Sequence, residues 1–271
     1  MPRVQIDNFI IDYDEAGIGV PIIFIPGLTE FKEAFAFQFR GLQDSYHVFS
    51  YDIRRGLKRA SDYTLDLLVG DLRGLLEALN LDSAVICGHS FGGLIAMQFA
   101  LQYPEKTKAL ILVSSFPHVS EDLTDRIVGF ISSGEHPLHG SIGARIKAQM
   151  GKLLGMNKAG ALVMESQIAA VTEAARQSLK TSKTSITQRL HIMDKADFRA
   201  ALPEILSPTL VIAGAKDREF FLSSAQTMYE GIPDSSLEVI EDAGHLCFLT
   251  RHDEFNSAVD EFLSDRLAEI S

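Results

Sequence analysis

The sequence predicts an α/β fold in which helices cover both faces of a mostly parallel sheet. Short apolar runs typical of strands alternate with helical segments through the first 113 residues. Several of these runs are apolar throughout, as strands buried on both faces are. The alternation stops after residue 113 and resumes after Pro208. With 271 residues, 46% of them apolar, the chain can form one large domain that carries one insertion.

The first half of the chain supplies most of the predicted sheet. Phe9 to Asp14 alternates apolar and polar residues, as a half-buried antiparallel strand does. Leucines from Leu65 to Leu79 recur at helical spacing, which predicts an amphipathic helix. The expected strands are 9–14, 21–25, 46–51, 84–87 and 108–113, and the expected helices are 33–43, 63–80 and 94–103.

Residues 114–199 interrupt this alternation with segments of helical composition separated by Ser, Gly and Pro. A helical insertion between two strands of one sheet is most simply a cap over the ends of those strands. We therefore expect a core domain of residues 1–113 and 200–271 and a cap of residues 114–199. The cap helices are expected at 122–131, 142–154, 159–176 and 185–193, followed in the core by strands at 209–213 and 237–240 and helices at 223–231 and 253–267.

A strand-to-helix turn, Gly88-x-Ser90-x-Gly92, is the most informative motif in the chain. An apolar strand precedes it, and a helix that ends at Pro104 follows it. Such a turn presents its serine on a strained backbone with the hydroxyl exposed. The context predicts a nucleophilic serine. A glycine-rich helix start that Ser90 merely caps is the structural alternative.

Composition excludes several classes of function. A net charge of −11 repels polyphosphate and argues against a nucleic-acid partner. No apolar run approaches 18 residues and the first residues lack a signal-peptide pattern, so we expect no membrane association and a cytoplasmic location. Cys87 and Cys247 are expected in the core without a disulfide. No metal-ligand spacing, phosphate loop or dinucleotide motif occurs, so we expect neither metal nor cofactor.

The chain resembles the α/β-hydrolase superfamily nearly end to end. The resemblance rests on Pro26-Gly27-Leu28, the elbow at residues 88–93, Gly214-Ala-Lys-Asp217 and Ala243-Gly244-His245, in that order. It implies an eight-stranded, mostly parallel sheet flanked by helices, with a helical cap inserted after the sixth strand. The small bacterial serine esterases and lactonases of the superfamily are the most similar group.

The superfamily resemblance also predicts a catalytic triad. A serine hydroxyl needs a base, and the base needs a carboxylate that holds its tautomer. Ser90 is the expected nucleophile, and His245 is the expected base because it lies in a glycine-led loop after a late strand. Asp217 occupies the usual position of the acid. Glu219 is its nearest rival, and Asp242 is interpreted as a turn former or an exposed charge.

Two backbone N–H groups are expected to bind the oxyanion of the tetrahedral intermediate. One belongs to Phe91, directly after the nucleophile, and the other to Leu28 by family position. The chain departs from the family at Pro26, where histidine is usual, and at Arg55, which stands where the family has glycine directly after Asp-x-Arg. The N–H donors survive the first change, and the second indicates a rearranged loop.

These residues predict a serine hydrolase that cleaves carboxylic esters or lactones of small to medium acyl groups through an acyl-enzyme. The triad itself does not separate esterases from carbon–carbon bond hydrolases or cofactor-free haloperoxidases and perhydrolases. A ligand sensor of the same fold that retains its triad is the alternative from a different class. Turnover of a generic ester distinguishes the enzyme from the sensor. The sequence predicts a small-molecule substrate and leaves the oligomeric state open.

The cap is expected to set substrate size. Met150, Met156 and Met164 lie within it, and such residues either pack the cap onto the core or line a pocket. Residues 114–200 hold 11 Lys or Arg against 8 Asp or Glu. This excess of positive charge is interpreted as a solvated surface, with attraction of anionic acyl groups as the alternative.

Overall fold

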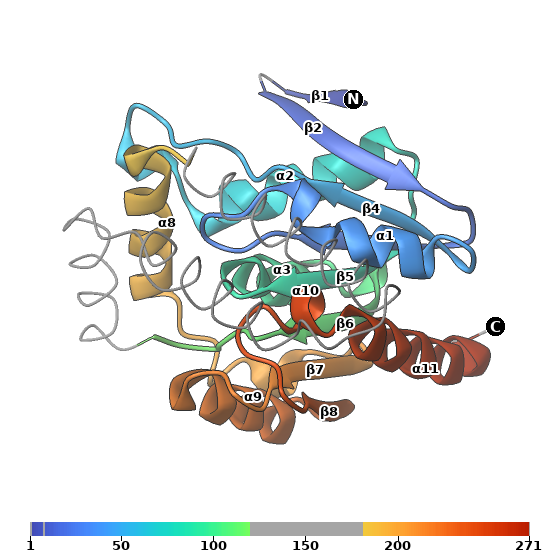
Figure 1. Cartoon of the computed structure of the whole chain (residues 1–271). Coiled ribbons are helices and arrows are strands. Elements are labelled where there is room, and N and C mark those ends of the chain that lie inside the picture. Colours follow the sequence, from blue (N-terminus) through green and yellow to red (C-terminus); the bar gives the residue numbers. More distant parts are fainter. Residues whose placement is uncertain (1, 8, 120–180, 271) are drawn as a thin grey trace, which may run out of the picture.

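The computed structural model describes residues 2–7, 9–119 and 181–270. An eight-stranded sheet with the order β1-β2-β4-β3-β5-β6-β7-β8 runs through the molecule (Figure 1). β1 and β2 are antiparallel to their neighbours, and the strands from β4 through β8 are parallel. The strands are β1 Arg3–Ile6, β2 Phe9–Ala16, β3 Val20–Ile25, β4 Tyr46–Tyr51, β5 Ala84–His89, β6 Thr107–Val113, β7 Thr209–Gly214 and β8 Ser235–Ile240.

Helices cover both faces of the sheet. The side chains of β5 divide alternately between two apolar layers: Ala84 and Ile86 face α2, α3 and α9, whereas Val85 and Cys87 face α1, α10 and α11. This division is the one expected of a strand buried on both faces. The helices are α1 Ala36–Leu42, α2 Leu65–Ala78, α3 Phe91–Gln102, α8 Lys183–Lys195, α9 Glu219–Gly231, α10 Cys247–Thr250 and α11 His252–Ile270, with short 3₁₀ helices η1 Lys32–Phe35, η2 Ala60–Asp62, η3 Pro104–Lys106 and η4 Leu202–Glu204.

The predicted α/β architecture is confirmed, and the differences lie in short elements. The helix expected at residues 33–43 divides into η1 and α1. The edge strand β1 was missed, although Val4 and Ile6 alternate with polar residues. The expected helix at 185–193 lies within α8. The expected helices at 122–131, 142–154 and 159–176, with the three cap methionines, lie outside the described residues.

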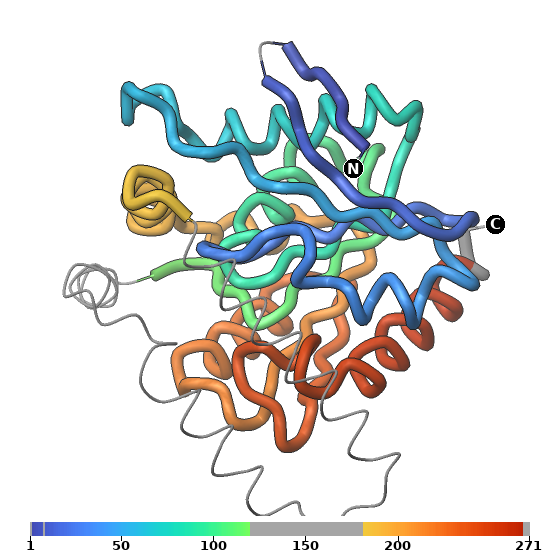
Figure 2. The backbone as a smooth tube through the Cα atoms, turned by 45° about the horizontal axis from the view of Figure 1, so that its top comes forward, coloured from blue at the N-terminus to red at the C-terminus, as the bar shows by residue number. Residues whose placement is uncertain are grey.

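The carboxyl ends of the parallel strands lie together at one edge of the sheet. The chain leaves β6 at this edge and returns to it before it enters β7. The outgoing and returning segments pair there, through an antiparallel bridge of His118 and Asp197 and a 2.8 Å hydrogen bond from Phe198 N to the Pro117 carbonyl. α8 lies beside this edge in both views (Figures 1 and 2). No helix within the described ranges is both long and apolar enough to cross a bilayer.

Candidate active site

Ser90 lies at the turn between β5 and α3, with φ 51° and ψ −115°. A residue other than glycine rarely adopts this region, and such strain is typical of functional turns. The turn is fixed from both sides: Ser90 N donates to the Val113 carbonyl at 2.9 Å, and Ser115 Oγ donates to the Ser90 carbonyl at 2.9 Å. A Cβ on Gly92 would clash with the carbonyl oxygens of Ile25 and Pro26. The start of α3 therefore packs directly against the loop after β3.

His245 and Asp217 come from the loops after β8 and β7 and meet at the same edge. Nδ1 of His245 lies 2.9 Å from Oδ2 of Asp217, whose side chain is only 3% exposed. The other carboxylate oxygen accepts the Arg218 N–H at 2.8 Å. Because Nδ1 faces a carboxylate, it carries the proton of the neutral ring, which leaves Nε2 as the acceptor.

The two alternative carboxylates lie elsewhere. Glu219 is exposed at the first turn of α9. Asp242 is exposed, has φ 59°, and pairs with Lys216 at 2.5 Å. The structure therefore brings Asp217, and neither rival, to His245.

The surroundings of His245 favour its neutral form. Burial lowers the pKa of His245, and the nearby charge of His89 acts in the same direction. The hydrogen bond to Asp217 opposes this shift without reversing it. The ring of Phe221 packs beside the His245 ring, with centroids 4.2 Å apart. A histidine that stays neutral to lower pH than usual is thus held in a partly apolar setting.

Ser90 is 9% exposed. In the part of the chain that the structure describes, its hydroxyl makes no hydrogen bond to His245. Catalytic hydrogen bonds are often long or misaligned without substrate and tighten when it binds.

The expected oxyanion donors lie on the two adjoining segments. Phe91 is the first residue of α3, where N–H groups have no partner within the helix. Leu28 follows β3 in the loop against which α3 packs. Within the described ranges, no acceptor is bonded to the Leu28 N–H. Both residues therefore offer an open backbone donor at this edge.

A second acid–histidine pair, Glu30 and His89, contacts the first, and the sequence did not predict this pairing. His89 is 1% exposed, and its Nδ1 lies 2.9 Å from Glu30 Oε2. Its other ring nitrogen is 3.0 Å from the His245 carbonyl oxygen. Burial alone would lower the pKa of His89, but the charge and hydrogen bond of Glu30 raise it. Glu30 lies 59 positions from His89, so no local pattern indicates their pairing.

Cys87 and Cys247 are free and buried, as expected of core residues. Burial raises the pKa of Cys247 to about 12, so this thiol is not a nucleophile at neutral pH. No three His, Cys, Asp or Glu side chains of the described residues are grouped so as to hold a metal ion.

Comparisons with known proteins agree with this fold. The α/β-hydrolase fold family model matches residues 20–252. A Klebsiella pneumoniae protein provisionally named carbamate hydrolase RutD is 28% identical over 92% of this chain and 93% of its own. The enol-lactonase of Burkholderia xenovorans LB400 has a TM-score of 0.75, with 22% identity over 97% of this chain and all of that chain. Est816, described as an N-acyl homoserine lactone degrading enzyme, has a TM-score of 0.71, with 28% identity over 96% of this chain and all of its own. The chain belongs to the α/β-hydrolase fold family.

Proposed function

We propose that this chain is a serine hydrolase that cleaves carboxylic esters or lactones of small to medium acyl groups. The observation that carries the proposal is the 2.9 Å contact between His245 Nδ1 and Asp217, at the sheet edge where Ser90 occupies its strained turn. This arrangement supplies a neutral base whose Nε2 is free to accept a proton. The likeness to Est816 supports the choice of lactones among the substrates.

The reaction divides into two acyl transfers. Ser90 Oγ bonds to the substrate carbonyl carbon while its proton passes to His245 Nε2, and the N–H groups of Leu28 and Phe91 bind the oxyanion. Collapse breaks the bond to the leaving oxygen, which takes the proton from His245. Water then gives a proton to His245 and attacks the acyl carbon. The acid leaves, and His245 returns the proton to Ser90 Oγ.

Residues 114–199 form the cap in this proposal and set substrate size. Its returning helix, α8, lies beside the edge that carries Ser90 and His245 (Figure 1). Insertions at strand ends commonly carry specificity, while the sheet carries stability.

Replacement of the nucleophile tests the function directly. Ser90→Ala is expected to remain folded and to lose turnover of p-nitrophenyl acetate, because the hydroxyl forms the acyl-enzyme. Fluorophosphonate labelling followed by intact mass should show one adduct on the wild type and none on the variant. Ser61→Ala, at an exposed serine of η2, is the matched control and should keep both properties. Turnover near the wild-type rate in Ser90→Ala would reject the assignment.

Carbamate hydrolysis is the second candidate, favoured by the relative that aligns over nearly its whole length with this chain. The same serine and oxyanion donors serve a carbamate carbonyl, and only the leaving atom differs. A panel of esters, lactones and carbamates compared by kcat/KM distinguishes the two. A preference for carbamates would change the proposed substrate class and keep the roles of Ser90 and His245, and analysis of the products would show whether the C–O or the C–N bond is broken first.

A further inference from the structure

Arg189 on α8 reaches the loop that carries the proposed oxyanion donor Leu28. Its side chain is buried, with 4% exposed, and Nη1 donates to the Leu28 carbonyl at 2.7 Å. The remaining donors bind three further oxygens: the Ile53 carbonyl at 3.2 Å, the Arg54 carbonyl at 3.4 Å and the Tyr63 hydroxyl at 3.3 Å. Leu28 is thus bonded to a residue 161 positions away in the chain.

The described partners of Arg189 are all neutral. Within the described residues, no carboxylate forms an ion pair with its guanidinium, although a buried charge is costly unless it is fully hydrogen-bonded. The rigid fork of the guanidinium meets this requirement through several backbone carbonyls at once. The same guanidinium lies over the Phe91 ring, 5.9 Å from its centroid. Arg189 therefore touches both residues whose N–H groups are proposed to bind the oxyanion.

A second contact from the same segment binds the next carbonyl of the loop. Thr181 Oγ1 donates to the Thr29 carbonyl at 3.2 Å. On the inner side, the Glu30 carboxylate accepts the Gly27 N–H at 2.7 Å and contacts His89. The loop is therefore held between the core on one side and the 181–189 segment on the other.

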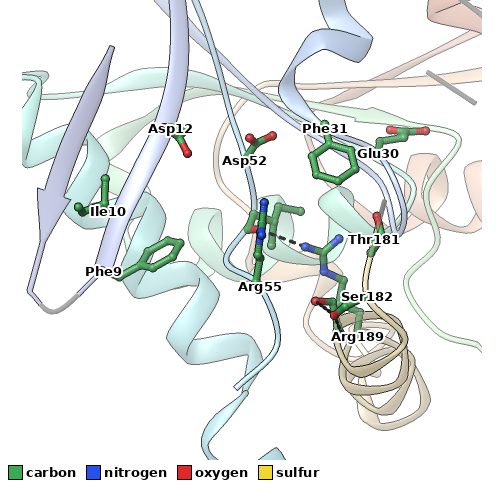
Figure 3. Close-up of a pocket in the computed structure, with 12 residues that line it drawn as sticks. Phe9, Ile10, Asp12, Glu30, Phe31, Asp52, Arg55, Thr181, Ser182 and Arg189 are labelled. Carbon is green, nitrogen blue, oxygen red and sulfur yellow. Dashed lines mark hydrogen bonds between the residues drawn. The ribbon is translucent and has the colours of Figure 1, made fainter. Parts of the chain in front are cut away.

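A cavity of about 160 Å³ separates the loop residues Glu30 and Phe31 from Thr181 and Ser182 at the start of α8 (Figure 3). Arg189 spans this region from α8 toward the chain around Asp52 and Arg55 (Figure 3). Beside this cavity the Leu28 side chain packs against the core, and its carbonyl and that of Thr29 are bonded by Arg189 and Thr181.

α8 is itself hydrogen-bonded to the core, so its contacts can hold the loop after β3 in a fixed position. Gln188 bonds both the N–H and the carbonyl of Leu57, at 2.9 Å and 2.7 Å. Ser185 Oγ accepts the Gly56 N–H at 2.8 Å. A Cβ on Gly56 would lie 2.8 Å from Gln188 Oε1 and 2.9 Å from Ser185 N, so the close approach of α8 favours glycine at this position.

We propose that Arg189 is a positioning residue that sets the direction of the Leu28 N–H by holding the Leu28 carbonyl. The two groups flank the same Cα, so rotation about its backbone bonds would carry the N–H away from the oxyanion. Oxyanion donors act only within about 2.7–3.1 Å of the developing charge. The inference rests on the proposed function, because it assigns an orientation to one of its donors.

The decisive variant is Arg189→Lys, which keeps the charge and loses the fork. We expect kcat to fall by about tenfold to a hundredfold with KM nearly unchanged, since loss of a whole oxyanion donor costs about 10²–10³ in kcat. The affinity for a trifluoromethyl ketone, whose tetrahedral adduct places an oxyanion in the hole, should fall in proportion. Arg73→Gln is the matched control and should leave both unchanged, because Arg73 is exposed on α2 and pairs with Glu77 along the same helix. A folded Arg189→Lys protein with wild-type kcat would overturn the proposal.

A second measurement does not depend on turnover. Amide hydrogen exchange of a peptide that covers residues 26–31 should be faster in Arg189→Lys than in the wild type. Thr181→Val removes the Thr29 contact and should give a smaller increase, and it provides the test if Arg189→Lys fails to fold. Unchanged exchange in every folded variant would reject the positioning role. Absence of Ser90-dependent turnover in the wild type would instead reject the proposed function.

Discussion

At the scale of single residues, the candidate site combines residues placed by short local motifs with residues whose partners lie far away in the chain. Ser90, Asp217 and His245 each follow a strand within a short glycine-containing motif, so their placement is a local property of the sequence. Glu30 and Arg189 act through partners 59 and 161 positions away. Only the folded chain brings such pairs together, which is why no spacing pattern revealed them.

The carboxylate that holds His245 gives the first residue-scale prediction. Asp217→Asn should lower kcat by roughly 10³–10⁴, because an amide N–H facing Nδ1 favours the wrong tautomer of the base. Glu219→Gln and Asp242→Asn should each cost less than about tenfold, because neither side chain contacts His245 and one ordinary surface contact has a small effect. Steady-state kinetics on one p-nitrophenyl ester measures all three. A large loss at Glu219 with little change at Asp217 would reverse the choice of acid.

The pH profile of kcat/KM provides a second test at the same site. The base must be neutral, and burial lowers the pKa of His245, so the acid limb should lie below the ordinary value of about 6.5. His89 contributes to this lowering through its charge. His89→Gln removes that charge and should move the acid limb to higher pH. Movement to lower pH, with the variant folded, would contradict this account of the site.

At the scale of elements, the elbow joins the start of α3 to the loop after β3, and Gly92 occupies the contact. Gly92→Ala should destabilise the protein by about 1–3 kcal/mol, because the added methyl overpacks two backbone carbonyls that cannot move aside. Gly70→Ala is the matched comparison: it lies within α2 with no atom within 4 Å of its added Cβ. That change should stabilise by about 0.5–1 kcal/mol, as Ala favours a helix interior. Urea unfolding measures both, and equal effects would show that the elbow contact is not tight.

Strand prediction succeeded where burial on both faces makes a run wholly apolar, as in β3, β5, β6 and β7. It failed at β1, four residues on the edge of the sheet, because pairing with β2 rather than intrinsic pattern makes it a strand. α10 has only four residues, too few to show helical periodicity.

At the scale of the whole molecule, one carboxylate should oppose folding at neutral pH. Burial raises the pKa of Asp52 to about 6, and the charges of Glu33 and Asp12 add to this. A raised pKa means that the folded state holds the proton more tightly, so stability falls as pH rises from about 4 to 6. Asp52→Asn, which keeps an acceptor for the Lys32 N–H, should therefore raise the free energy of unfolding at pH 8 by about 1 kcal/mol after allowance for solvent screening.

The gain from Asp52→Asn should shrink toward zero as pH approaches 4, because the wild-type carboxyl is then protonated in the folded state. Urea unfolding at pH 4.5 and pH 8 checks this dependence. The exposed Asp82→Asn should change stability by less than about 0.5 kcal/mol at both values. An equal gain from Asp52→Asn at both pH values would indicate a packing effect instead of a titration.

The pairing of residues 117–118 with 197–198 bears on how this lineage can diversify. Since the two ends of the intervening chain are already joined, each doubling of its length costs only about 0.6 kcal/mol of closure entropy. Evolution can therefore exchange this stretch for others of different length and leave the sheet intact. Such an exchange must leave α8 in place, because Arg189 on α8 donates to the Leu28 carbonyl in the core. A designer who builds chimaeras should place the joints after residue 118 and before residue 181, so that the contacts of Thr181 and Arg189 with the loop after β3 are preserved.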